Sequence, residues 1–238
     1  MADTSEMIVC KSCGCTGKGN YCNFCGQSFK VKRISLPGLL HDVFHFFTHL
    51  DKGFAYTLKK LVTTPGDMQK AYIAGERSKH QKPFSMFFIC ATVAAVTRYW
   101  IFKVIVNYFH TGNVAEMNFF HEYMVLIHIA MMPVYALIAF LLFYKAKYNY
   151  AEIGVLILYT VSFFLLVVSV ISLLKFIWPE MDTAYVELPI LTIYNVITFV
   201  NFFDKLPRWI VVIKSVVLIT TLFILFQLVE DFTIQHIT

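Results

Sequence analysis

Residues 152–175 read EIGVLILYTVSFFLLVVSVISLLK, an apolar run with charged residues only at its two ends. An α-helix rises about 1.5 Å per residue, so about 20 apolar residues cross the roughly 30 Å hydrocarbon core of a bilayer. The run therefore predicts a membrane-spanning helix. The composition agrees, because 58% of the 238 residues are hydrophobic and only 15% are charged, whereas about a quarter of the residues in soluble domains are charged.

Four further stretches of similar length and character occur in the chain. Together the five stretches cover residues 84–109, 122–144, 152–175, 185–203 and 208–229. We therefore expect an all-α polytopic membrane protein, in which residues 84–230 form a bundle of about five transmembrane helices. The fourth stretch is the weakest candidate, because it is short and carries Glu187 and Pro189 near its start.

The loops between these stretches alternate in charge. Loops 145–151 and 204–207 contain lysine, whereas loops 110–121 and 176–184 contain neither lysine nor arginine. Because basic loops stay in the cytosol, we expect a cytosolic N-terminus and a C-terminal tail, residues 231–238, on the outer side. We also expect no cleaved signal peptide, since the polar N-terminal segment lacks an apolar core and the first spanning helix can direct insertion.

Two short cysteine motifs precede the apolar part of the chain. They are Cys10-Lys-Ser-Cys13-Gly14 and Cys22-Asn-Phe-Cys25-Gly26, in the spacing Cys-x2-Cys-x8-Cys-x2-Cys. Two such turns can supply four thiolates to one tetrahedral ion, and a glycine after each pair suits the turn. We therefore predict that residues 1–30 form a small zinc-ribbon-like head, with these four cysteines as ligands of a structural zinc ion.

Two alternatives to zinc remain for these cysteines. Disulfides would need an oxidising compartment, which the expected cytosolic position does not provide. A redox-active Cys-x-x-Cys would open a helix in a βαβ unit, for which the sequence shows no pattern. We leave Cys15 outside the ligand set, and we expect Cys90, which lies in an apolar run, to be a small core residue.

Residues 31–83 connect the head to the first apolar stretch. From Leu39 to Leu61 the apolar residues recur every three to four positions, which predicts amphipathic helices that lie in the cytosolic interface with their apolar face toward lipid. The polar face carries His41, His45 and His49, which could bind a metal or form a plain polar stripe. The basic excess of residues 1–83 favours anionic lipid headgroups over nucleic acid as its partner.

Three polar side chains of the apolar stretches form a second candidate site. His121 and His128 are seven residues apart and so share a helix face, and Arg98 lies about 21 Å into the first span. Arg98 could extend to the outer headgroups, or it could face the bundle interior and pair with Glu122 or Glu187. A polar intramembrane site lined by Arg98, His121 and His128 competes with the interpretation that these residues only pack between helices.

Several motifs also resemble a known family. They are Tyr21-Cys22-Asn-Phe-Cys25-Gly26-Gln27, Asp51-Lys-Gly53-Phe54-x-x-Thr57-Leu58, Pro65-Gly66, Tyr72-Ile73-x-Gly75-x-Arg77 and Pro83-Phe84. This series is similar to that of an uncharacterised bacterial family, a domain of unknown function with a cysteine-rich head before several membrane spans. The resemblance implies a bacterial inner-membrane protein without an assigned activity. In this pattern Arg77 could contact a lipid headgroup or pair with an acid of an inner loop.

No catalytic motif stands out in the sequence. It has no glycine-rich phosphate loop, no His-Glu-x-x-His and no nucleophile elbow, so an enzyme is the least favoured class. We expect a partner-binding or scaffolding protein that meets the bilayer through its helices and a protein partner through its zinc head, and that is compatible with oligomers. The alternative is a transporter of small molecules or lipids that uses the helix bundle.

Overall fold

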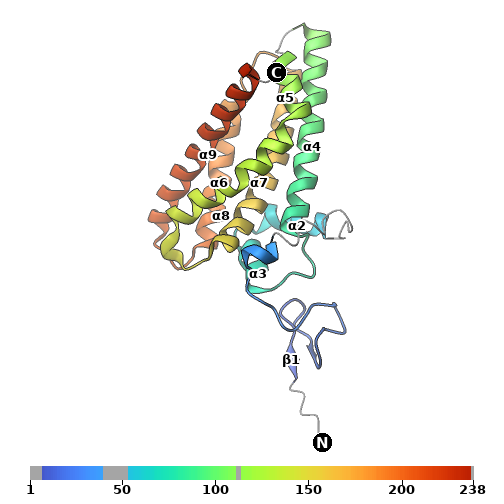
Figure 1. The fold of residues 1–238 in the computed structure, drawn as a ribbon, viewed down its shortest axis with the longest axis vertical. Coiled ribbons are helices and arrows are strands. Elements are labelled where there is room, and N and C mark those ends of the chain that lie inside the picture. The colour runs from blue at the N-terminus through green and yellow to red at the C-terminus, as the bar shows by residue number, and fades with distance from the viewer. Residues whose placement is uncertain (1–6, 40–52, 111–113, 237–238) are drawn as a thin grey trace, which may run out of the picture.

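The computed structural model describes residues 7–39, 53–110 and 114–236 (Figure 1). Two short strands, β1 (Ile8–Val9) and β2 (Thr16–Gly17), pair antiparallel in the N-terminal head. The rest is helical, and Figure 1 shows the helices stacked above the head with the two chain ends at opposite extremes. The helices are α2 (Phe54–Thr63), α3 (Asp67–Ala74), α4 (Pro83–Val104), α5 (Val114–Glu122), α6 (Met124–Leu142), α7 (Tyr150–Ser172), α8 (Ala184–Phe202) and α9 (Arg208–His236).

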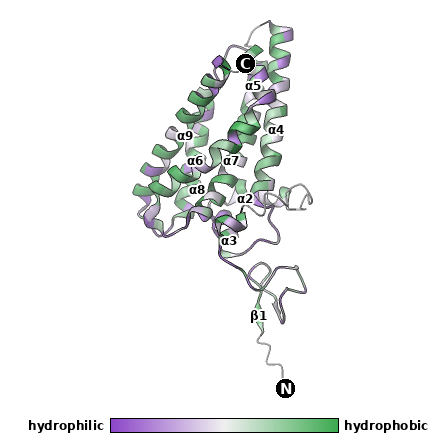
Figure 2. Ribbon diagram, in the orientation of Figure 1, coloured by the Kyte–Doolittle hydropathy of each residue, from purple (hydrophilic) through white to green (hydrophobic). Residues whose placement is uncertain are grey.

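Five of the described helices are long and apolar enough to cross a membrane. They cover Pro83–Phe109, Met124–Leu142, Tyr150–Phe176, Ala184–Phe202 and Arg208–His236. These bounds lie close to the five apolar stretches of the sequence, so the prediction of an all-α polytopic membrane protein is confirmed. Figure 2 shows that hydrophobic residues colour most of these helices, whereas the head is mixed. Pro83 occupies the first turn of α4, where its missing N–H costs no hydrogen bond.

Helix α7 is the centre of the bundle. In its most apolar window 67% of the residues are buried, against at most 39% in the other four spanning helices. It packs against α4, α6 and α8, and its side chains meet theirs in one core that contains Phe87, Tyr135, Leu156 and Phe199. The outer helices consequently turn large apolar side chains outward, such as Ile213 on α9, as a surface in contact with lipid requires.

Helices α2 and α3, with the turn that follows them to residue 82, form a platform under the bundle. The expectation that the apolar face of the stretch from Leu39 to Leu61 meets lipid was wrong for its described ends, because Leu39 and Leu61 are buried in a core shared with Val155 and Tyr159 of α7. An amphipathic pattern records only that one face is apolar, and here the bundle provides the apolar partner. The segment 40–52, with His41, His45 and His49, lies outside the described residues.

The turn between α2 and α3 fits closely against α8. Gly66 has φ +86°, and a Cβ atom there would lie 2.2 Å from the backbone oxygen of Thr198. The side chain of Asn201 donates a hydrogen bond of 2.9 Å to the carbonyl of Pro65, and the Tyr194 hydroxyl donates one of 3.0 Å to that of Leu61. Position 66 of the Pro-Gly motif is therefore a close contact with α8 that requires glycine.

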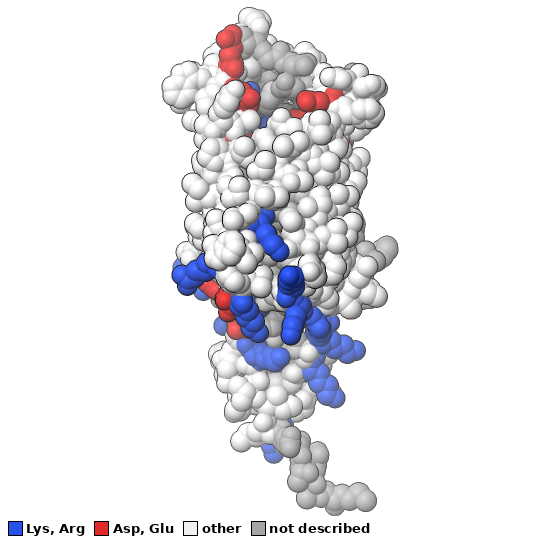
Figure 3. All heavy atoms as spheres, turned by 90° about the vertical axis from the view of Figure 1, so that its left-hand side faces the viewer, with Lys and Arg blue, Asp and Glu red and all other residues white. Residues whose placement is uncertain are grey.

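Charged residues separate toward the two ends of the bundle. Figure 3 shows most of the lysine and arginine gathered around the head end, with a few acidic side chains among them, and further aspartate and glutamate near the opposite end of the face drawn. In the chain, the loop lysines Lys145, Lys147 and Lys205 lie where α6 and α8 end, and Glu180 and Asp182 lie just before α8 begins. The charge separation runs along the axis that would cross a membrane.

Candidate metal centre and its attachment to the bundle

The two cysteine motifs adopt the same backbone turn. In the first, the N–H of Gly14 donates to the carbonyl of Cys10, and the N–H of Cys10 donates to the carbonyl of Cys15. In the second, the N–H of Gly26 donates to the carbonyl of Cys22, and the N–H of Cys22 donates to the carbonyl five residues later. Gly14 and Gly26 both have left-handed φ values, +76° and +72°, which explains the glycine after each pair.

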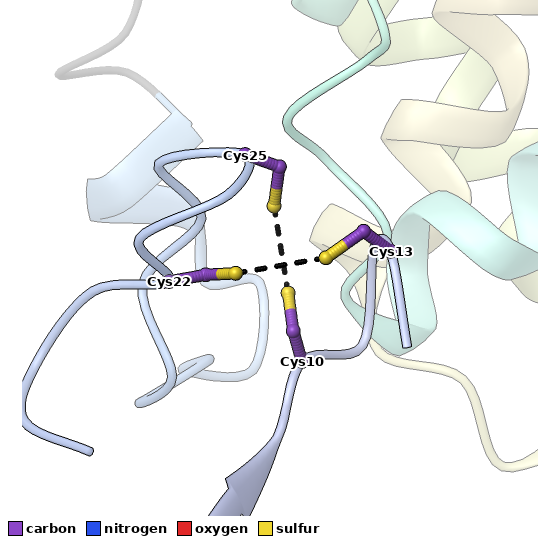
Figure 4. Close-up of side chains that lie close together, drawn as sticks. All are labelled: Cys10, Cys13, Cys22 and Cys25. Atoms are coloured by element: carbon purple, nitrogen blue, oxygen red, sulfur yellow. Dashed lines mark hydrogen bonds between the residues drawn. The ribbon is translucent and has the colours of Figure 1, made fainter. Parts of the chain in front are cut away.

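The four sulfur atoms face one another between these turns (Figure 4). The Sγ atoms of Cys10 and Cys25 are 3.5 Å apart, those of Cys13 and Cys22 are 3.6 Å apart, and all four lie within 4.8 Å of one another. A disulfide would require a sulfur separation of about 2.05 Å. A tetrahedral ion with metal–sulfur bonds of about 2.3 Å would give separations of about 3.8 Å. The observed distances therefore fit a four-thiolate metal site.

Backbone N–H groups of the turns point toward the sulfurs and change their acidity. Burial raises the pKa of Cys10, but the N–H groups of Cys13 and of the residue before it outweigh burial, so that this pKa falls to about 6. The N–H groups of Cys25 and of the residue before it likewise lower the pKa of Cys22. The N–H of Cys15 lowers the pKa of Cys13, but burial and the other thiols raise it more. Such N–H donors are the usual support of metal-bound thiolates.

The other two cysteines stay apart from the cluster. The sulfur of Cys15 does not belong to the group of four, in agreement with its exclusion from the predicted ligands. Cys90 is fully buried in the core between α4 and α7, as expected of a small core residue. Within residues 7–39, 53–110 and 114–236, the four cysteines are the one group of three or more His, Cys, Asp or Glu side chains whose ligand atoms converge.

The head is fixed to the platform by hydrogen bonds from its first cysteine motif, Cys10–Cys13. The Lys11 ammonium donates to the carbonyl of Ala74 at 3.3 Å, and the hydroxyl groups of Ser12 and Ser78 lie 2.5 Å apart. Gly75 is the contact point, because a Cβ atom there would lie 2.8 Å from the side chain of Val31. The first cysteine motif therefore packs directly on the end of α3.

Arg77 was predicted to contact a lipid headgroup or an inner-loop acid. In the structure it binds the connector, residues 31–39, which follows the head. Its Nε donates to the carbonyl of Tyr72 at 3.2 Å and a terminal nitrogen donates to that of Lys32 at 3.1 Å. Its guanidinium also stands 5.7 Å from the centre of the Tyr72 ring. These contacts give Arg77 a positioning role within the protein.

An ion pair that the sequence analysis missed joins the connector to α7. Arg33 donates two hydrogen bonds to Glu152, of 2.7 and 2.9 Å, and a third to the carbonyl of Lys147. Glu152 also accepts from the N–H of Asn149, whose side chain caps α7 and donates to the carbonyl of Ile34. The motif Asn149-x-x-Glu152 at the basic end of a span was the available signal, because an acid there needs a cation.

The second candidate site is brought together in part. Arg98 and His128 line one cavity of about 100 Å³ among the helices. The Nδ1 of His128 donates to the carbonyl of Met124 at 2.8 Å, and its ring packs 4.5 Å from that of Phe226. Of the two acids considered beside Arg98, Glu187 lines the same cavity, whereas Glu122 is exposed. His121 lies in α5, and its side chain is outside the described part of the structure.

With this geometry in view, the chain was compared with known proteins. Residues 51–95 match a family described as a protein of unknown function (DUF3667). The match covers the platform and the first half of α4, where several of the motifs quoted from the sequence lie. No curated protein and no solved structure matches the chain. In this part the chain is therefore similar to a family whose description assigns no activity.

Proposed function

We propose that this protein is a partner-binding or scaffolding protein of the bacterial inner membrane, with a structural zinc ion in a cytosolic head. The sulfur separations and the N–H donors at the thiols support zinc. Four thiolates fill all positions of a tetrahedral site, so such an ion holds the head together and leaves no position for catalysis. The basic loops at the head end support the cytosolic side for the head.

The observation that carries this proposal is the combination of a firmly held head with exposed aromatic side chains. The head is tied to α3 by the hydrogen bond of Lys11, and the connector that follows the head is tied to α7 by Arg33. Phe24, between two of the cysteines, is 80% exposed and Tyr21 is 65% exposed. Neither side chain serves the core, and exposed aromatics are typical anchors in protein interfaces. The head therefore offers a rigid surface to a protein partner.

The test is the recovery of a partner from native membranes with three forms of the protein, namely the wild type, Phe24→Ala and Lys18→Ala. Phe24→Ala removes the proposed anchor, and Lys18→Ala changes another exposed residue of the same head. We expect Phe24→Ala to lower the recovery of a partner about tenfold or more, with unchanged zinc content and unchanged recovery by Lys18→Ala. Equal recovery by all three forms would overturn the role of this surface.

The proposed orientation has a separate test. A membrane-impermeant maleimide added from outside should label His236→Cys near the end of α9 and should spare Ser35→Cys in the connector. Labelling of position 236 from the cytosolic side would overturn the orientation.

The alternative function, a transporter of small molecules or lipids, is favoured by the cavity that Arg98, His128 and Glu187 line within the bundle.

A further inference from the structure

Two neighbouring cavities lie toward the end of the bundle opposite the head. The outer one has a volume of about 380 Å³ and lies between the loop before α8 and the last turns of α9. The inner one has a volume of about 100 Å³ and reaches His128. The two share the side chains of Arg98, Glu187, Phe223 and Phe226. Their combined size is that of a small-molecule site.

Glu187 stands where the two cavities meet. Its side chain is only 7% exposed, and its Oε1 atom has no hydrogen-bond partner among the residues that the structure describes. A buried carboxylate oxygen without a donor is costly, and it usually marks a place where a ligand or an ion completes the site. The Oε1 atom of Glu187 can therefore accept a hydrogen bond from a ligand in the cavity.

The outer cavity favours a cation. Its wall holds five carboxylates and two cationic side chains, and the excess of negative charge attracts positive ligands. The carboxylates are Glu180, Asp182, Glu187, Glu230 and Asp231, and the cationic side chains are Arg98 and Lys175. Figure 3 shows acidic side chains at this end of the molecule on the face that it draws.

The carboxylates do not form a metal site. Apart from the four cysteines of the head, no group of three or more acidic, His or Cys side chains in the described ranges brings its ligand atoms together. A calcium or magnesium ion needs several oxygen atoms at about 2.0 to 2.6 Å. Carboxylates spread around a wall instead suit a larger organic cation, which they attract through their field.

The inner cavity supplies an apolar wall for the rest of such a ligand. Leu165, Leu191 and Phe226 line it, and these apolar side chains suit a hydrophobic group. We propose that the two cavities form a binding site for an organic ammonium compound with a short apolar body. The ammonium group donates to Oε1 of Glu187, and the apolar body fills the inner cavity toward His128.

The first test uses wild-type protein in nanodiscs of zwitterionic lipid and two probes of the same shape. Calorimetric titration should show saturable binding of 2-phenylethylammonium, after subtraction of empty nanodiscs. The neutral 2-phenylethanol should bind about tenfold or more weakly, because it lacks the charge that the acidic wall attracts. Absence of saturable ammonium binding, or equal affinity for both probes, would overturn the proposal. So would binding of calcium in place of the ammonium probe.

The second test places the ligand at Glu187. Glu187→Gln keeps the shape of the side chain but removes its charge, and we expect affinity for 2-phenylethylammonium to fall about tenfold or more. Glu180→Gln, an exposed residue of the same wall, should change it by less than about threefold. Unchanged affinity in Glu187→Gln would contradict the assignment. The comparison of the two probes on wild-type protein decides the ligand class even if this variant does not fold.

Discussion

The ion pair between Arg33 and Glu152 should hold the connector against the bundle, and Arg33→Ala should release it. The Glu152 side chain is 5% exposed, whereas that of Arg33 is 64% exposed. Removal of arginine therefore leaves a buried carboxylate without its cation at the start of α7. The head would keep its own fold, because the four cysteines lie outside this contact.

The size of the effect follows from burial on the two sides. Removing one partner of a fully buried pair costs about 3 to 5 kcal/mol, but exposed pairs contribute at most about 1 kcal/mol. Glu152 also keeps the hydrogen bond from the N–H of Asn149 at 2.9 Å. We therefore expect a loss of about 2 kcal/mol for local opening of the connector, which corresponds to an increase of about thirtyfold in the open population.

Hydrogen exchange of the connector amides measures that population in protein held in nanodiscs. Exchange in residues 31–39 should accelerate about thirtyfold in Arg33→Ala and change little in Lys32→Ala, which removes the same charge from an exposed neighbour. Adding Glu152→Gln to Arg33→Ala should slow the exchange again, because it neutralises the stranded carboxylate while glutamine still serves the helix cap. Equal exchange in Arg33→Ala and Lys32→Ala would refute this reasoning.

Three further outcomes test the metal centre and the platform. Cys22→Ser should abolish zinc binding in elemental analysis of the purified protein, whereas Cys15→Ser should retain one ion per chain. Gly66→Ala should cost more than about 3 kcal/mol and abolish folded yield, whereas Gly154→Ala, whose Cβ would meet only the Leu39 side chain at an ordinary contact distance of 3.8 Å, should leave the thermal unfolding temperature unchanged or raise it. Burial lowers the pKa of His80 from 6.5 to about 4, so the folded state binds fewer protons than the unfolded state between these values. The stability contribution of His80 is complete above about pH 6.5 and is lost as the pH falls toward about 4. A His80→Gln variant that loses as much thermal stability as the wild type over this pH range would contradict the assignment of the loss to His80.

The spanning helices and the cysteine cluster could be predicted because each depends on local sequence. A span requires about 20 apolar residues in succession, and this requirement placed residues 152–175 within two residues of the observed start of α7. The cluster needs two short turns, and the glycines after Cys13 and Cys25 specify their backbone conformation. In both cases the sequence contains nearly all the information that the structure uses.

The contacts between distant segments could not be predicted in the same way. An apolar stripe from Phe54 to Leu61 has the same pattern whether it meets lipid or protein, and only the tertiary fold showed that it meets α7. Arg33 and Glu152 are 119 residues apart in the chain, and each had several candidate partners of opposite charge. The cavity at Glu187 likewise depends on three separate segments, the end of α4, residues 175–187 and the end of α9.

The family match includes some of these contacts and not others. It covers residues 51–95, and several residues of this segment form contacts between platform, head and bundle. Thr57 accepts from the N–H of Gln81, Gly66 allows the approach of α8, and Arg77 binds the connector. The match ends before Arg98, so it does not reach the residues that line the cavity. The segment that is similar to the family therefore contains contacts that join the platform, the head and the bundle of this chain, whereas the residues that line the cavity lie outside that segment.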